Sequence, residues 1–526
     1  MAATSIESSI RFNQIFWFGV IGLAALFTGF YLASSKFTLA LVAVTFGWLV
    51  LLPYHAKLAA YLSITTFSSA LILPYFPGRP YMWEFAAFLA WSGLIITVSL
   101  RRYAPDAAHY IRENKWLFIG VILYCAVLLV TMMERGFGLR IMGTDQMGGR
   151  FYFQQLMCAI FPVLFVLVRF NENTLLKLYY LQCILTLTFL VSDFAFSFGG
   201  GGLWGLLQFF ELPGDAANFE RQAQQFGIRR FQSLSVVGQG LMLLILVFHK
   251  LEDFFTHKAI YLVPMAAGVF GFGLLSGHRY LSLILIIAII FIAYTQRFYS
   301  IKNVLMTLAA MGAVLLPLIL YAHKLPLSAQ RALSYIPGIR IDHHARIDGS
   351  ATLETRRILR KVGFQMIPQY FWIGRGFMMP ARDLSHIWDP TYITTHVNQG
   401  KFYNGFIGLM VNTGIFGTLA MLIFLGAGTW IAYSVMAHLR LYGSDDWFSR
   451  MSCIVASVWM ANISAFLFFH GDSEFAMKTF SLQAGLLIAC KRCLDYRLES
   501  TDSEEENEET ADDNSPQPDR RIQPAF

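Results

Sequence analysis

Long apolar runs, separated by short polar segments, fill about half of the chain. A helix needs roughly 17–25 predominantly apolar residues to cross the ~30 Å hydrocarbon core of a bilayer. Most of the runs are near this length, so the pattern predicts an all-α polytopic membrane protein with about fourteen transmembrane helices. The predicted spans lie near residues 14–33, 37–53, 58–75, 82–100, 116–133, 151–168, 176–198, 233–249, 259–276, 280–295, 303–322, 404–434, 451–469 and 475–490.

The composition agrees with this pattern, since 56% of the 526 residues are hydrophobic and only 14% are charged. A soluble domain carries roughly 25% charged residues, so a chain of soluble domains is excluded and the lipid bilayer is the first predicted partner. The basic charge lies in loops between the spans, and the sequence contains no P-loop or dinucleotide-binding motif. We therefore predict neither nucleic acid nor a nucleotide cofactor as a partner.

Basic residues concentrate in every second loop. Such loops remain in the cytoplasm when a membrane protein inserts, which places both termini in the cytoplasm. Lys36 and Arg79 are single exceptions on the other face. The basic loops contain Arg101, Arg102, Arg112, Lys115, Arg169, Lys177, Lys250, Lys258, Arg297, Lys302, Arg440, Arg450, Lys491, Arg492 and Arg497.

The C-terminal segment 499–526 differs from the rest of the chain. It holds ten acids and two arginines, a balance of −8, so residues 1–498 carry +15 within the net charge of +7. A segment with few apolar residues and many Glu, Ser and Pro is typical of disorder. We expect residues 1–498 to form a membrane domain and residues 499–526 to form an acidic, disordered cytoplasmic tail.

The outer face carries one very long loop, residues 323–403. Loops longer than about 15 residues are uncommon unless they are functional, so this segment is a candidate for the site. Within it, SATLETRRILRKVGFQM predicts an amphipathic helix, because Ile358, Val362 and Met366 recur at every fourth position. Ser350 or Thr352 is the expected N-cap of that helix.

Arginines gather at the outer face, where the insertion rule disfavours positive charge. Ordinary ion pairs with outer acids are one explanation. The other is an anionic ligand, because the planar guanidinium suits phosphate oxygens and keeps its charge when partly desolvated. A lipid carrier that ends in pyrophosphate would place its anion at this depth, and anionic headgroups are the weaker alternative. The outer cations are Arg135, Arg140, Arg150, Arg229, Arg230, Arg279, Arg356, Arg357, Arg360 and Lys361.

Four stretches of the outer segments carry a resemblance to a known family. GHRYLSL is similar to a G-S-R-x-x-x-L segment, with His278 in place of the serine. RRFQSLSVVGQGLM, LETRRILRKVGFQMIPQYFWIGRGF and FYNGFIGLMVNTGIFG follow the order of three further family segments. Together they cover roughly residues 220–420 and resemble the bacterial O-antigen ligase and O-antigen polymerase superfamily.

The resemblance implies a C-type glycosyltransferase architecture in the bacterial inner membrane, with the long loop as a periplasmic cover over the site. Such proteins transfer a glycan from undecaprenyl pyrophosphate to an acceptor hydroxyl, without a metal or a cofactor. Arg279 and Arg356 match the functional arginines of the family, Asn404 matches its asparagine, and Arg230 is a weaker match. The candidate catalytic residues are Arg279, Arg356, His396 and Tyr403, and the candidate substrate-binding residues are Arg230, Arg357, Asn404, Arg140 and Arg375.

The sequence departs from the family pattern at the expected base. Tyr403 stands where the family has histidine, and Asn412 replaces an acid that often precedes the later glycine. Histidine suits proton transfer near neutral pH, whereas tyrosine, with an ordinary pKa of about 10, suits donation or orientation. His396 lies upstream and is a candidate substitute. Three explanations stay open: a displaced base, an altered or lost activity, or a tyrosine that only anchors the membrane interface.

The sequence leaves one other function open, and it also raises the question of a metal site. A flippase for lipid-linked oligosaccharides also suits many helices with an internal cationic site, but many transporters are built from related halves, and this chain shows no repeat. A metal site at His343, His344, Asp342 and Asp348 is not predicted, because adjacent histidines point apart on a helix and no second cluster has ligand spacing.

Overall fold

The computed structural model describes residues 42–43, 45–47, 49–50, 54–74, 79–136, 149–198, 203–211, 228, 230–231, 233–377 and 392–513. In these ranges the chain is helical, with two isolated β-bridges and no strand. Eight described helices are long and apolar enough to cross a membrane, and two shorter apolar helices accompany them. The protein is therefore an all-α polytopic membrane protein. The number fourteen stays a prediction, because the first two predicted spans lie largely outside the described residues.

The helices follow one another with short connections over most of the chain. The first nine are α3 (His55–Thr66), α4 (Met82–Ser99), α5 (Ala107–Glu113), α6 (Lys115–Arg135), α7 (Gly149–Cys158), α8 (Phe161–Leu167), α9 (Glu172–Leu185), α10 (Thr188–Phe198) and α13 (Ser233–Phe248). The others are α14 (Ala259–Ser276), α15 (Tyr280–Thr295), α16 (Ile301–Leu320), α17 (Leu327–Leu333), α18 (His343–Met366), α19 (Tyr392–Asn398), α20 (Gly405–Tyr442), α21 (Trp447–Ser464) and α22 (Ala476–Asp513). Short turns of helix are η2 (Trp204–Gln208), η3 (Leu251–Phe255), η4 (Ala322–Lys324), η5 (Pro368–Tyr370), η7 (Ala465–Phe469) and η8 (Ser473–Phe475).

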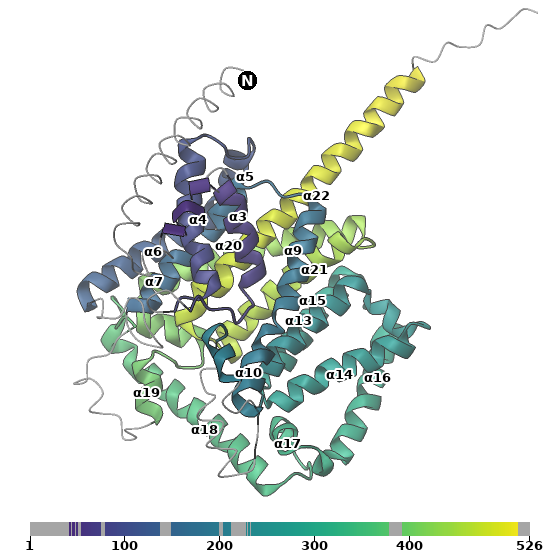
Figure 1. The fold of residues 1–526 in the computed structure, drawn as a ribbon. Helices are drawn as coiled ribbons and strands as arrows, with labels where there is room; N and C mark the ends of the chain where they lie inside the picture. Colours follow the sequence, from purple (N-terminus) through teal and green to yellow (C-terminus); the bar gives the residue numbers. More distant parts are fainter. Residues whose placement is uncertain are drawn as a thin grey trace, which may run out of the picture.

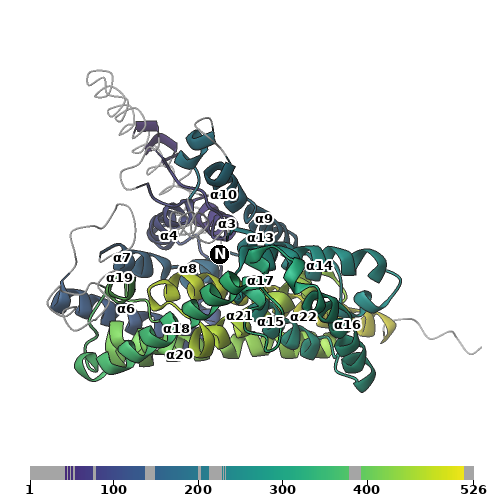
Figure 2. The same ribbon diagram turned by 90° about the horizontal axis from the view of Figure 1, so that it is seen from below.

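The two longest helices, α20 and α22, cross the centre of the view in Figure 1, and Figure 2 shows that α20 lies along one face of the bundle. α20 packs against α6, α21 and α22, and α22 also packs against α7 and α8. The fully buried Trp459 of α21 meets Phe424 of α20 and Phe480 of α22 in edge-to-face contacts, with ring centroids 6.2 and 5.4 Å apart. Close packing of this kind, rather than hydrophobic burial, associates helices within lipid.

α16 lies at the edge of the bundle in both views (Figures 1 and 2). None of its residues is buried, although its sequence is strongly apolar. A helix that is apolar all round and uncovered by protein is suited to contact with lipid tails.

α20 is broken near its start at Gly414, which adopts a φ of +68°. A left-handed conformation costs little at glycine, and the break frees backbone groups on both sides of it. These groups pair with residues 371–376 of the long loop: Arg375 N–H donates to Val411 O at 2.8 Å, and Ile415 N–H donates to Phe371 O at 2.7 Å. The break therefore fixes an internal segment of the long loop to a membrane helix.

The long loop is itself helical in its described part. It contains α17, α18 and α19, and its own apolar cluster includes Leu359, Tyr370 and Val397. α18 contains the predicted amphipathic helix but begins earlier, at His343. Its N-cap is Asp342, whose carboxylate accepts from His344 N–H at 2.8 Å. Neither Ser350 nor Thr352 is the N-cap. The apolar stripe fades toward the start of α18, so periodicity alone placed the start too late.

Ion pairs join the loops that the charge pattern places on one face. Each pair links segments far apart in the sequence, so these helix ends lie side by side. The pairs are Lys250–Asp445, Arg492–Asp106, Lys491–Glu113, Arg497–Glu172 and Arg497–Asp446. Tyr496 adds a hydrogen bond to Asp106, whose pKa these partners lower despite the opposing effect of burial.

The start of the acidic segment differs from the predicted disordered tail. α22 continues to Asp513 and projects from the bundle as a single helix (Figure 1). The physical reason is that Glu is a good helix former and that α22 already supplies the nucleus, so each added residue only extends it. Residues 514–526 lie outside the described part of the chain.

Candidate functional site

A cavity of about 620 Å³ lies at one end of the bundle. It is formed where α3 ends and where α4, α7, α13, α20 and α22 begin, and the turn between α14 and α15 and helix α18 also line it. All of these membrane-helix ends are those that the charge pattern places on the outer face. Its volume falls in the range of roughly 300–1,000 Å³ that is usual for ligand pockets.

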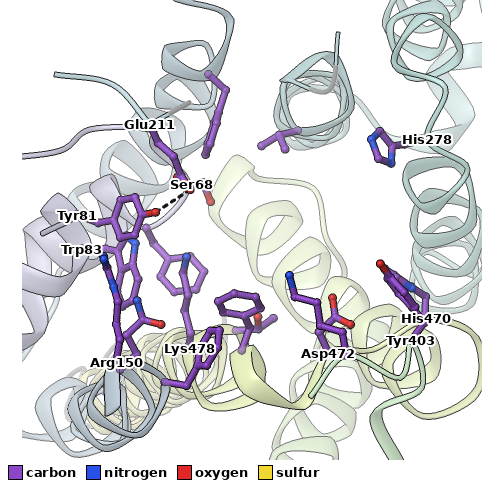
Figure 3. A pocket seen from close by; sticks show the side chains of 18 of the residues that line it. Ser68, Tyr81, Trp83, Arg150, Glu211, His278, Tyr403, His470, Asp472 and Lys478 are labelled. Carbon is purple, nitrogen blue, oxygen red and sulfur yellow. Dashed lines mark hydrogen bonds between the residues drawn. The ribbon is translucent and has the colours of Figure 1, made fainter. Parts of the chain in front are cut away.

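One side of the cavity, which we call the Arg356 wall, includes Tyr403, His470, Asp472 and His278 (Figure 3). We add to it two further lining residues, Arg356, which packs on Tyr403, and Lys401, which precedes Tyr403 by two positions. The guanidinium carbon of Arg356 lies 5.1 Å from the ring centroid of Tyr403. The Tyr403 ring stacks on His470 at 5.2 Å, and the ring of His396 lies 5.7 Å from Tyr403 behind it. Arg356, Tyr403 and His470 thus form a column that contributes a cation and two polar rings to the cavity.

Tyr403 is held in a strained backbone conformation, with a φ of +51°. Such a φ is a genuine outlier for a bulky residue and persists only where the surroundings impose it. The next residue, Asn404, caps α20: its side chain accepts from Ile407 N–H at 3.0 Å and donates to Leu467 O at 3.2 Å. Asn404 therefore fixes the start of α20 and positions Tyr403, and it does not itself line the cavity.

Burial and nearby arginines keep the two cavity histidines neutral. Burial, followed by the charges of Arg331, Arg230 and Arg356, lowers the pKa of His278 to about 3. Burial is also the main cause of a lowered pKa at His470, against the opposing effect of Asp472. Among the residues described, Asp472 Oδ1 has no hydrogen-bond partner. The wall thus combines a fixed cation, a carboxylate with spare acceptor capacity and neutral imidazoles.

The opposite side, which we call the Lys478 wall, includes Ser68, Tyr81, Trp83, Arg150, Glu211 and Lys478 (Figure 3). Tyr81 and Trp83 stack with their centroids 5.8 Å apart. Arg150 lies 5.0 Å from the Tyr81 ring centroid, and the Lys478 ammonium lies 4.2 Å from that of Trp83. Cation, ring, ring and cation therefore form a second column.

Backbone and side-chain hydrogen bonds hold the Lys478 wall in place. Met82 N–H donates to Leu71 O at 2.9 Å, and Glu211 N–H donates to Ala70 O at 2.6 Å. The Tyr81 hydroxyl donates to the Glu211 carboxylate at 2.9 Å. Glu84 pairs with Arg150 at 3.1 Å and accepts from Gln154 at 2.6 Å. A wall so well bonded is rigid before any ligand arrives.

Arg279 belongs to a separate group beside the cavity, the Asp348 cluster (Arg230, Arg279, Arg331 and Asp348). Asp348 accepts hydrogen bonds from both Arg230 and Arg331. Arg331 also donates to Gly277 O at 2.7 Å, and Arg279 donates to Ser334 Oγ at 2.7 Å and to Arg331 O at 3.1 Å. These bonds clamp the turn between α14 and α15, from which His278, rather than Arg279, lines the cavity.

The remaining predicted residues lie outside the cavity lining. Arg375 is 1% exposed, donates to Asn412 Oδ1 at 2.8 Å and packs over Phe402, so it lies behind the Arg356 wall. Arg357 points to solvent, with 82% of its side chain exposed, and meets Glu354 at 3.6 Å. Arg140 lies outside the described residues. His396 does not line the cavity, but its ring lies against that of Tyr403, which does.

Sequence reasoning singled out Arg356, Tyr403 and, among the outer arginines, Arg150, but it missed Asp472, His470 and Lys478. A signal for Lys478 was present, because a lysine inside a predicted span is costly and usually functional. The stretch HGDSE (residues 470–474) also offered three ionisable residues, His470, Asp472 and Glu474, at the edge of a span. In the described residues, no group of three or more His, Cys, Asp or Glu side chains is arranged to hold a metal ion.

Comparisons with protein-family models and with curated proteins find no match to this chain. The resemblance to the ligase and polymerase superfamily therefore stays a hypothesis carried by its four motifs, and the function has to be argued from the cavity.

Proposed function

We propose that the protein is a membrane glycosyltransferase that moves an oligosaccharide from a polyprenyl-pyrophosphate carrier to an acceptor hydroxyl. The reaction would take place at the outer face of a bacterial inner membrane, as a ligase or polymerase step of surface-polysaccharide assembly. The observation that carries the proposal is the Arg356 wall. It brings a cation and an incompletely bonded carboxylate together in one cavity at the ends of membrane helices.

The chemistry needs only groups that the wall offers. The acceptor oxygen attacks the anomeric carbon of the donor and forms the new glycosidic bond, while the bond from that carbon to the pyrophosphate oxygen breaks. The acceptor proton passes to Asp472, which acts as general base. Negative charge develops on the departing pyrophosphate, where Arg356 and Lys401 stabilise it. His470 stays neutral and adds no further positive charge beside the base.

A second pocket supports a lipid-linked donor. It has a volume of about 300 Å³ and shares Phe67, Ser68, Val236 and Thr479 with the cavity. Its lining continues along α9, α13, α21 and α22, and includes Leu243, Val455, Val458 and Leu486. The lining also includes the amides Gln182, Gln239, Asn462 and Gln483, so the extension is partly polar. Its apolar residues would contact the first isoprene units of a polyprenyl chain whose pyrophosphate lies in the cavity.

The direct test is reconstitution. Purified protein in detergent or liposomes is mixed with a polyprenyl-pyrophosphate oligosaccharide and a glycan acceptor, and released polyprenyl pyrophosphate and extended acceptor are measured by mass spectrometry. We expect both products in equal amounts. Asp472→Asn should lower the rate by about 10²–10⁴-fold, as for loss of a general base. Donor that crosses the bilayer without bond exchange would overturn the proposal in favour of a flippase.

A deletion strain distinguishes the two forms of the reaction. Loss of a polymerase should leave single lipid-linked repeat units, whereas loss of a ligase should leave finished lipid-linked chains. A normal surface-glycan ladder in the deletion strain would contradict both.

A further inference from the structure

Lys478 has an unusual environment for a cation. It lies on α22, inside a predicted span, and faces the cavity as part of the Lys478 wall (Figure 3). Its ammonium is surrounded by rings: the centroids of Trp83, Phe67 and Phe475 lie 4.2, 5.7 and 6.0 Å away. The rings attract the cation and fix its position, but they accept no directed hydrogen bond of ordinary strength.

Within the described part of the chain, no carboxylate lies within 4.0 Å of the Lys478 ammonium. Glu84 and Glu211 are close enough to attract it, but each is held by another group. Glu84 is taken up by Arg150 and Gln154, and Glu211 by the Tyr81 hydroxyl. An ammonium carries three donors, and buried donors are normally paired. The three N–H groups of Lys478 are thus available to a ligand in the cavity.

We propose that Lys478 binds the carboxylate of an acidic sugar, so that the transferred oligosaccharide contains a hexuronic acid near its pyrophosphate end. This inference rests on the proposed function and names the donor class for the same cavity. The Arg356 wall supplies Arg356 and Lys401 for the pyrophosphate. Lys478 lies on the other side of the cavity, where the sugars of a donor bound in this way would extend (Figure 3).

The type of cation supports a carboxylate rather than a second phosphate. Arginine offers a planar fork that matches phosphate oxygens, whereas lysine is a compact point charge that needs only one acceptor oxygen. Arg150, the arginine of this wall, is occupied by Glu84. Gln154 also lines the cavity, and its side-chain oxygen has no hydrogen-bond partner among the described residues, so it suits a sugar hydroxyl.

Binding measurements test whether Lys478 binds a sugar carboxylate, and they do not depend on catalytic turnover. The probes are an oligosaccharide with one glucuronic acid, the same oligosaccharide with that carboxylate reduced to the alcohol, and inorganic pyrophosphate. We expect wild-type protein to bind the acidic oligosaccharide about tenfold or more tightly than the reduced one. Lys478→Met should abolish this preference and leave pyrophosphate binding unchanged, and Lys478→Arg should restore part of it. Lys361→Met, at an exposed lysine of α18, is the matched control and should behave as wild type.

A substitution on the Arg356 wall should have the opposite effect on the binding of the two kinds of probe. Arg356→Ala should weaken pyrophosphate binding and keep the preference for the acidic oligosaccharide. Equal binding of the two oligosaccharides by wild-type protein would overturn the inference, as would a Lys478→Met variant that loses pyrophosphate instead. Failure of the proposed function looks different: wild-type protein would prefer the acidic oligosaccharide yet transfer neither lipid-linked form to any acceptor.

Discussion

Arg356 and the arginines of the Asp348 cluster both lie near the end of the bundle that holds the cavity, but they differ in which groups face their charge. Arg230 and Arg331 both form ion pairs with Asp348, so much of their positive charge is compensated within the protein. Arg356 has no ion pair among the described residues, and its closest aromatic partner is the Tyr403 ring. Arg230 and Arg331 use their charge in structural ion pairs, whereas the charge of Arg356 faces the cavity.

The difference shows how a set of outer arginines divides by function. A buried cation is tolerated when it is paired or when a ligand pairs it. Burial lowers the pKa of Arg356, a sign that its surroundings do not fully compensate its charge. The paired arginines instead hold the turn that carries His278. Substitutions in the two groups should therefore affect different measurements.

The largest effect is expected at Arg356. Arg356→Ala should lower the transfer rate by about 10²–10³-fold, because a donor to the developing charge on pyrophosphate is lost. Thermal unfolding in detergent should change little. Arg357→Ala is the matched control, since its neighbouring side chain points to solvent, and it should keep the rate within about twofold. Equal losses in the two variants would show that α18 needs basic charge in general and that Arg356 has no separate role.

Asp348→Asn should affect stability most. It leaves two buried arginines without a counter-charge, and breaking such a buried pair costs about 3–5 kcal/mol. Glu354→Gln, which removes an exposed pair on the same helix, should cost less than about 1 kcal/mol. Thermal unfolding followed by tryptophan fluorescence compares the two. Unfolding midpoints that do not differ would mean that the Asp348 cluster is not a structural clamp.

Much of the fold follows from the sequence because it depends on local pattern. Apolar runs predicted the membrane helices. The ion pairs Lys250–Asp445 and Arg492–Asp106 join loops that the basic pattern predicts on one face, while the orientation of that face in the membrane stays a prediction. The order of the helices around the bundle cannot be predicted from the sequence. Lipid-facing and protein-facing sides are both apolar, so periodicity says little about which helix packs against which.

The candidate site also contains residues that a local sequence pattern predicts and residues that only the three-dimensional packing brings together. Arg356 and Tyr403 were predicted from motifs that lie within one segment. Lys478 and Trp83 meet across almost 400 residues, and no local pattern brings a lysine in one span to a tryptophan in another. The family motifs group Arg279 with Arg356, but Arg279 lies in the cluster around Asp348 and Arg356 does not. Asp348 is one of several outer-loop acids that could pair with an arginine, and no local pattern says which arginines it meets. Pairing in three dimensions decides the role of each arginine.

A smaller effect is expected at Arg279, which acts by placing His278. Arg279→Lys keeps a donor for Ser334 but loses the second contact to α17, so the rate should fall by about tenfold. The check is a double-mutant cycle with His278→Ala. If Arg279 works through His278, adding Arg279→Lys to that variant should cost almost nothing further. Independent, additive losses would indicate that Arg279 contacts the substrate itself.

The comparison between paired and unpaired charges extends to Glu474, next to the Arg356 wall. Glu474 is fully buried, and neither of its carboxylate oxygens has a hydrogen-bond partner among the described residues. Burial, reinforced by the charge of Asp472, raises the pKa of the Glu474 carboxyl to about 8, well above its ordinary value. Asp348 forms ion pairs with two arginines, whereas Glu474 forms no ion pair within the described part of the chain. The folded protein therefore favours the protonated form of Glu474.

This raised pKa fixes the sign of a pH dependence. Above about pH 4.3 the unfolded chain releases the Glu474 proton while the folded protein keeps it, so stability from this group falls as pH rises toward 8. Glu474→Gln keeps the shape and removes the ionisation. Its unfolding midpoint should match wild type at pH 5 and exceed it at pH 8, by about 1 kcal/mol or more in stability. Glu354→Gln should differ from wild type by the same small amount at both values. A Glu474→Gln variant that is less stable than wild type at pH 8 would mean that the ionised carboxylate is stabilised, first of all by the charge of Lys401, and that Glu474 is compensated by cations as Asp348 is.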